Sequence, residues 1–220
     1  GQSAGDEVAA AGYNVGIGAY ALSDVATQDG TVAVGYSALN ALTSGEQNTA
    51  IGYQSMSVEA DGDFSTAVGY QALVAQTGTD GTVANTAIGA TAGAGLTTGT
   101  YNTALGYKAI LACDDGIGNT GIGYGTLAIS TLGNYNTALG YGAGANVSTS
   151  NQGIYIGHGA GYVATTGVSN TLIGANSGNN AGTAYGITQS GFNTAVGFET
   201  LGASSADAII TDGYNTVMGY

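Results

Sequence analysis

Proline is absent from the 220 residues, and there is a single cysteine, Cys113. Without proline, every residue keeps the backbone N–H that a β-ladder requires. One cysteine cannot form a disulfide within the chain, so disulfides do not hold this fold together. No apolar run in the sequence is long enough to form a membrane-spanning helix, and we expect no membrane insertion.

Positive charge is almost absent, because Lys108 is the only basic residue against fourteen acids, for a net charge of −13. Binding to a phosphate backbone relies on Lys and Arg, which makes nucleic acids and anionic membranes poor partners. Hydrophobic residues make up 44% of the chain, which excludes charge-driven disorder. The 41 glycines lack the spacing of collagen. The acids are expected to keep an otherwise uncharged β surface soluble.

A short phrase repeats along the chain: Asn-Thr-Ala-Leu-Gly-Tyr stands at 102–107 and returns at 136–141. Its glycine anchors twelve copies, most of them at one constant interval, at Gly18, Gly35, Gly52, Gly69, Gly89, Gly106, Gly123, Gly140, Gly157, Gly174, Gly197 and Gly219. Insertions fall near 77–83, 179–189 and 203–212. A fixed period of this length is typical of a solenoid. We predict an all-β solenoid, or β-roll, of about twelve 17-residue rungs that forms one elongated domain over residues 1–220.

Each copy has the alternating chemistry of a strand. The threonine three before the anchor glycine, the aliphatic residue one before it and the tyrosine one after it share a face, which we expect to line the interior. Asparagine, alanine and glycine share the other face, which suits close approach to partner chains or to the opposite wall. A small–large pair then follows, so each rung is expected to contain two short strands. Four copies lack the large residue, and we expect a thinner core or a different turn there: Gly93, Gly144, Gly161 and Gly178.

Two side-chain columns are predicted to stack from rung to rung. Asparagines can bond amide to amide along the rod, as at Asn48, Asn102, Asn119 and Asn136. Tyrosines recur with the same spacing, as at Tyr53, Tyr70, Tyr107, Tyr124 and Tyr141. We interpret them as a core or groove-filling aromatic ladder. The alternative is a row of surface rings that stack on sugars.

The best candidate metal ligands are acids beside turn glycines: Asp61 and Asp63 in one rung, Asp114 and Asp115 in another. Hard oxygen ligands in a tight turn suit Ca²⁺. Neither stretch matches an EF-hand loop or a nonapeptide calcium repeat, so solvated carboxylates remain the alternative. No other cofactor is expected.

The run Tyr-Asn-Thr-Ala-Leu-Gly-Tyr at 101–107 resembles the shaft repeats of long phage tail fibres and tail spikes. More distantly, the chain is similar to the head repeats of trimeric autotransporter adhesins, whose Asn-Ser-Val-Ala-Ile-Gly phrase has the form of residues 48–52. The resemblance implies a parallel homotrimer on a virion or cell surface, with attachment as its task. Adhesin heads have shorter units, and this sequence shows no coiled-coil stalk or membrane anchor. We interpret the chain as a piece of a longer protein.

The leading functional hypothesis is a structural and adhesive fibre segment whose partners are copies of itself and a cell-surface glycan or protein receptor. A self-polymerising extracellular filament and an ice-binding solenoid are alternatives. A polysaccharide-cleaving spike would need paired carboxylates, which Glu59, Asp61 and Asp63 could supply. We do not expect an enzyme, because His158 is the only histidine and stands in the ring column, where it replaces a tyrosine.

Overall fold

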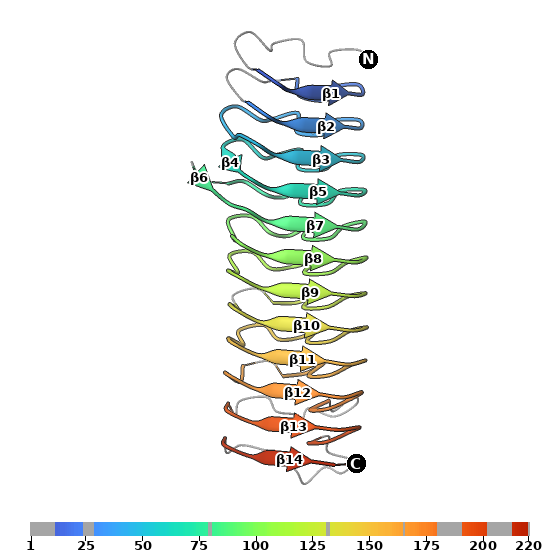
Figure 1. Ribbon diagram of the computed structural model, residues 1–220, viewed down its shortest axis with the longest axis vertical. Coiled ribbons are helices and arrows are strands. Elements are labelled where there is room, and N and C mark those ends of the chain that lie inside the picture. The colour runs from blue at the N-terminus through green and yellow to red at the C-terminus, as the bar shows by residue number, and fades with distance from the viewer. Residues whose placement is uncertain are drawn as a thin grey trace.

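The protein is a straight parallel β-solenoid (Figure 1). The computed structural model describes residues 12–23, 29–78, 81–130, 133–164, 166–179, 191–201 and 213–219, and these contain no helix. One sheet of twelve strands runs the length of the rod in chain order. Its strands are β1 Val15–Ile17, β2 Val32–Val34, β3 Thr49–Ile51, β5 Thr66–Val68, β7 Thr86–Ile88, β8 Thr103–Leu105, β9 Thr120–Ile122, β10 Thr137–Leu139, β11 Ile154–Ile156, β12 Thr171–Ile173, β13 Thr194–Val196 and β14 Thr216–Met218.

Every pairing in this sheet is parallel, and equivalent residues of the repeat lie beside one another. Thr103 pairs with Thr120, and Leu105 pairs with Ile122. The same register holds from β1 to β14, even where an insertion lengthens the repeat, as between Thr171 and its partner Thr194. The prediction of an all-β solenoid is confirmed.

The prediction of which side chains line the interior is wrong, because the two faces of the strands are exchanged. The middle alanine of the strand, such as Ala50 or Ala104, is buried, and so is the asparagine before the strand. The aliphatic residue at the end of the strand lies outward, with Ile51 40% and Leu105 43% exposed. The threonine column also reaches the outer surface, half-buried in most strands.

The opposite wall of the same rung explains this exchange. After the anchor glycine the chain returns beneath the strand and places a large apolar side chain in the same buried core as its alanine, as Leu39, Leu73 and Ile110 do. A rung of about 17 residues encloses a narrow interior, which one alanine and one leucine fill at ordinary packing density. The small-residue face therefore meets the wall of its own chain.

The returning segment is not the second strand that the sequence analysis expected. Residues two and four after the anchor glycine are left-handed, as at Gln54 with φ 51° and Met56 with φ 49°. This alternation curls the backbone into a turn. Rungs still bond through it, since the Gln54 N–H donates to the Tyr36 carbonyl over 2.8 Å. Within the described residues, Ala112 and Ile129 form an isolated parallel bridge in this region.

The anchor glycines stack on one another at the end of each strand. Gly106 has φ 130°, and a Cβ built on it would lie 2.6 Å from the carbonyl oxygen of Gly123. Neither that conformation nor that distance accommodates a side chain. The recurring glycine thus sets both the corner of the rung and the spacing to the next rung.

The core is not thinner where glycine replaces the large residue, contrary to the expectation. At Gly144 and Gly161 the ring of Tyr155, the only tyrosine at the middle of a strand, fills the space. A Cβ at Gly161 would lie 2.2 Å from the Tyr155 ring. At Gly93, Leu73 and Leu96 occupy the equivalent volume.

The insertion near 77–83 forms a small structure on the edge of the rod. Its β6 Gly81–Thr82 pairs in parallel with β4 Gly62–Asp63, beside the main sheet (Figure 1). The insertions near 179–189 and 203–212 lie outside the described residues, apart from Asn179.

Candidate functional site

The aromatic column lies on the surface of the rod, so its interpretation as part of the core is wrong. Aromatic residues follow most of the anchor glycines, and six tyrosines and one histidine among them form what we call the ring row: Tyr36, Tyr53, Tyr70, Tyr107, Tyr124, Tyr141 and His158. Its tyrosines are 45–56% exposed. Neighbouring rings stack, with centroids 4.6 Å apart at Tyr124 and Tyr141 and 5.3 Å apart at Tyr141 and His158. Ala90 interrupts the row, and Ala175 follows His158.

The asparagine column is a buried hydrogen-bonded ladder. The Oδ1 of Asn119 accepts from the Asn136 backbone N–H over 2.9 Å, and its Nδ2 donates to the Gly133 carbonyl over 2.8 Å. Asn48, Asn102 and Asn136 bond in the same way to the rung that follows. Amide-to-amide contacts also occur, as between Asn136 Nδ2 and Asn119 Oδ1 at 3.2 Å. The column satisfies buried backbone groups where each rung turns into its strand.

The four aspartates considered as calcium ligands each bond to the preceding rung. Asp61 accepts from the hydroxyls of Ser44 and Thr43, each over 2.7 Å, and these bonds, that from Ser44 first, lower its pKa. Asp63 accepts from the Glu46 backbone N–H.

Asp114 and Asp115 repeat this arrangement farther along the rod, where they accept from Thr97 and Thr98. The strands β5, β7 and β8 separate the two acid pairs, so the fold does not bring them together. No group of three His, Cys, Asp or Glu side chains suited to a metal occurs in the described ranges. The calcium site stays a prediction.

Glu59 is enclosed rather than presented to a substrate. Its carboxylate is buried and accepts from the backbone N–H groups of residues 60, 61, 62 and 78, and from the Gln76 amide over 2.6 Å. It therefore ties the first insertion to the turn of the preceding rung. With both oxygens engaged in this way, Glu59 does not provide the free carboxylate that glycoside hydrolysis requires.

Cys113 lies inside the rod. Burial raises the pKa of its thiol to about 11, an effect that the Gly116 backbone partly offsets. A thiol held in this state is a poor nucleophile at neutral pH. It serves as a small buried side chain whose sulfur accepts a hydrogen bond from Asn119 Nδ2.

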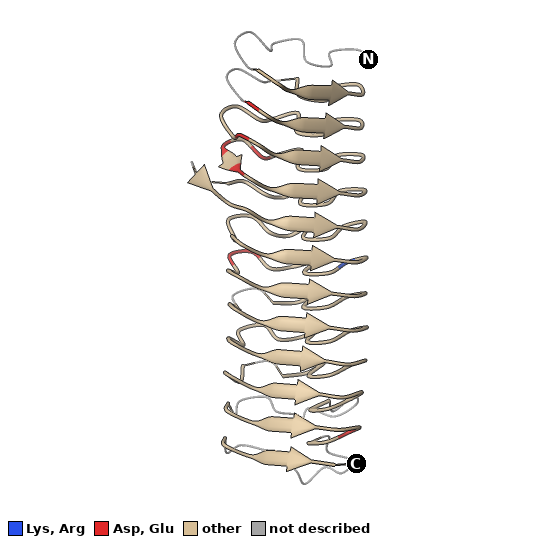
Figure 2. Ribbon diagram, viewed as in Figure 1, with Lys and Arg blue, Asp and Glu red and all other residues tan. Residues whose placement is uncertain are grey.

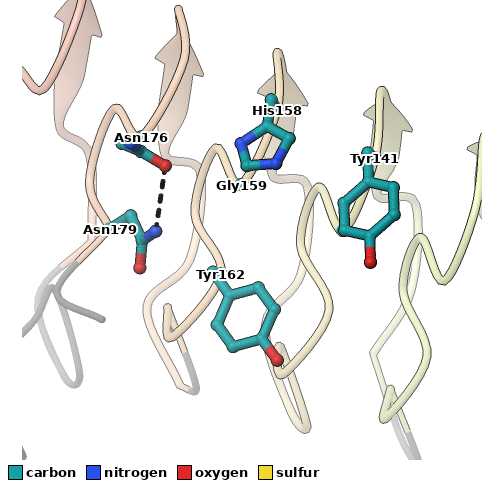
Figure 3. Close-up of a pocket in the computed structure, with 7 residues that line it drawn as sticks. Tyr141, His158, Gly159, Tyr162, Asn176 and Asn179 are labelled. Carbon is teal, nitrogen blue, oxygen red and sulfur yellow. Dashed lines mark hydrogen bonds between the residues drawn. The ribbon is translucent and has the colours of Figure 1, made fainter. Parts of the chain in front are cut away.

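One pocket opens beside the end of the ring row (Figure 3). It has a volume of about 220 Å³ and is lined by Tyr141, His158, Gly159, Tyr162, Asn176 and Asn179, together with Gly142. Figure 3 shows Tyr162 across from His158, with the two asparagines at one side and Tyr141 at the other. Asn179 Nδ2 donates to Asn176 Oδ1 over 3.3 Å, which orients the two carboxamides.

Sequence reasoning missed this pocket, although the repeat contained the signal. Tyr162 stands five after its anchor glycine, and no other copy has an aromatic residue there. Gly142 and Gly159 stand two after theirs, where most copies have a side chain, such as Gln54, Gln71 or Lys108, and where Gly125 is a further glycine. The position of the pocket was indicated by residues that depart from the repeat, not by the repeat itself.

Within the described part of the chain, no helix is long and apolar enough to cross a membrane. No family model, no curated protein and no solved structure matches this chain.

Proposed function

We propose that the chain is a rod segment of an extracellular or virion fibre, built of twelve rungs and assembled as a parallel homotrimer that serves attachment. The observation that supports this most is the outer face of the twelve-stranded sheet, which we call the sheet face. It carries one threonine or β-branched residue and one aliphatic residue per strand, and none of its aliphatic side chains is buried in the single chain.

The size of the sheet face favours a partner. Twelve strands at about 4.8 Å spacing and three residues of about 3.3 Å give a strip of roughly 500 Å². Monomeric proteins seldom expose apolar patches beyond about 300–600 Å². Five rings beside the strip, Tyr36, Tyr53, Tyr70, Tyr107 and Tyr124, are about half exposed and add roughly 100 Å² each. The total of roughly 1,000 Å² exceeds the patches of monomeric proteins and is above the ~800 Å² per partner of a stable interface.

The charge distribution favours a second copy of this chain as that partner. No strand of the twelve-stranded sheet contains a charged residue, and the described acids lie outside those strands, Asp63 in the small strand β4 and the others in connecting segments (Figure 2). Copies with a net charge of −13 can therefore meet along an uncharged strip while their acids stay in solvent. Parallel copies also present the same inter-rung spacing to one another, so that rungs can interdigitate.

The molar mass of the native particle, measured by light scattering on a size-exclusion column, tests the proposal. We expect three copies per particle. Replacing Ile88 and Leu105, 41% and 43% exposed on adjacent strands, by lysine should give a folded monomer, because the charges would be buried in the trimer. The matched control places lysine at Ile117 and Ile129, which are 38% and 50% exposed away from the sheet, and should remain trimeric.

Ice binding is the second candidate, and the exposed threonine column favours it. Thr103, Thr120 and Thr137 lie in register on the sheet face, one per rung, with Thr86 next at one end and Ile154 at the other. A wild-type particle that is monomeric and lowers the freezing point below the melting point would replace the fibre proposal. A mass that grows with concentration would instead indicate a self-polymerising filament.

A further inference from the structure

Departures from an otherwise regular repeat converge on one place. The column two residues after the anchor glycine lacks side chains at Gly125, Gly142 and Gly159, of which the last two line the pocket, and the column five after it gains a ring at Tyr162. In the same region the ring row changes from tyrosine to His158 and then to Ala175. A rung needs none of these changes to stack, because the other copies stack without them.

The glycines create the space, and the rings line it. A Cβ on Gly142 would lie 3.5 Å from the Tyr162 ring, and one on Gly159 would lie 2.8 Å from Asn176 Oδ1. Elsewhere the same position has side chains at similar backbone angles, as at Gln71 with φ 51° against 62° at Gly142. The absence of a side chain at these two glycines therefore keeps the pocket open and is not a requirement of the turn.

The chemistry of the pocket selects a neutral ligand. No Asp, Glu, Lys or Arg occurs between residues 116 and 198, and the pocket lies in the middle of this stretch. Its walls are the rings of Tyr141, His158 and Tyr162, and the carboxamides of Asn176 and Asn179 stand at one side (Figure 3). The Oδ1 of Asn179 is buried and accepts no hydrogen bond from the described residues.

We propose that this pocket binds one neutral pyranose residue of a glycan. An aromatic ring packs against the C–H face of a sugar, and carboxamides both donate to and accept from its hydroxyls. The volume of about 220 Å³ is below the ~300–1,000 Å³ of pockets for drug-sized ligands, which leaves room for a single sugar ring.

This inference rests on the proposed attachment role, for which it names the ligand class. It is also compatible with a trimer. The lining residues all lie outside the strands of the twelve-stranded sheet, and neither Tyr141 nor His158 is among the five rings counted with the sheet face. The sheet face is therefore left for other copies of the chain.

Saturation-transfer NMR on the whole chain tests the site with three probes, the methyl pyranosides of glucose, galactose and mannose. We expect transfer to the ring protons of at least one. Gly142→Gln, which places a side chain in the pocket, should reduce this transfer at least tenfold. Gly125→Gln is the matched control, because Gly125 holds the same position of its rung and a Cβ there meets nothing within 4 Å. Tyr162→Ala, which removes the ring wall without adding bulk, should also reduce the signal.

Two results would overturn the proposal: no transfer to any of the three pyranosides, or equal transfer with Gly142→Gln and Gly125→Gln. Indole is included as a flat apolar probe without ring hydroxyls, and its binding in place of every sugar would likewise overturn the glycan assignment. The light-scattering mass of the same samples is independent of these signals. A trimer without sugar binding would reject the pocket alone, whereas a monomer that binds sugar would reject the fibre and retain the pocket.

Discussion

One asparagine per rung makes the bonds that tie most rungs to the next. Asn119 is buried. Its Oδ1 accepts a hydrogen bond from the Asn136 backbone N–H, and its Nδ2 donates one to the Gly133 carbonyl. The recurrence of asparagine predicted a column. It did not predict that the bonds run largely from side chain to backbone, because sequence spacing does not show which backbone groups lie unpaired at the entry to each strand.

Replacing Asn119 by alanine leaves two buried backbone groups without partners. Each such group costs about 1–3 kcal/mol, so we expect a loss of roughly 2–6 kcal/mol in the free energy of unfolding. Denaturant unfolding followed by circular dichroism measures it. Asn134→Ala is the control, because Asn134 accepts from the Ile117 N–H at a half-buried turn where water can replace it. Equal losses in the two variants would contradict the ladder's role.

The sizes of the side chains on the strand and on the returning segment compensate for one another, so that the interior stays filled. Several rungs pair alanine on the strand with a large aliphatic residue on the returning segment, as Ala33 with Leu39, whereas Tyr155 lies opposite Gly144 and Gly161. The period placed the strands correctly. The side chains that line the interior could not be assigned from the strand alone, because a column of alanines can face either a partner chain or leucines of the same chain. The curled segment that carries those leucines does not have the alternating pattern of a strand.

Tyr155→Ala should therefore cost about 3–5 kcal/mol, the range for removing a buried aromatic ring. Adding Gly144→Leu restores the alanine–leucine pairing of the other rungs and should recover part of that loss. Leucine is compatible with the backbone there, since Leu127 at the same position has φ 48° against 58° at Gly144. Gly144→Leu alone should destabilise, because a Cβ there would lie 3.0 Å from the Tyr155 ring. Thermal unfolding of the wild type, the two single variants and the double variant gives the coupling free energy between the two positions. Purely additive changes in stability would contradict the idea that Tyr155 fills the space left by Gly144.

At the scale of the whole molecule, each rung contacts mainly its two neighbours, so stability accumulates along the rod and opening begins at its ends. The repeat predicted this architecture, because a solenoid places equivalent residues in columns. The sugar pocket is the opposite case. Tyr162 and Gly159 break their columns, and a method that searches for the shared pattern passes over such residues until the fold shows them side by side.

Cys113 provides a single probe of opening in the middle of the rod, between β8 and β9. Burial raises its pKa from 9.0 to about 11, and below pH 9 this alone lowers the thiolate fraction about a hundredfold relative to the unfolded chain. We expect alkylation by iodoacetamide at pH 8 to be at least a hundredfold slower in the native protein than in urea, measured by mass spectrometry. The native rate should continue to rise up to about pH 11, whereas the unfolded rate levels off above pH 9. Since the folded state holds this proton more tightly, the contribution of Cys113 to stability is full below pH 9 and is lost as the pH rises through 11. Native and unfolded rates that agree within a few-fold at pH 8 would mean that the middle rungs open as readily as the ends.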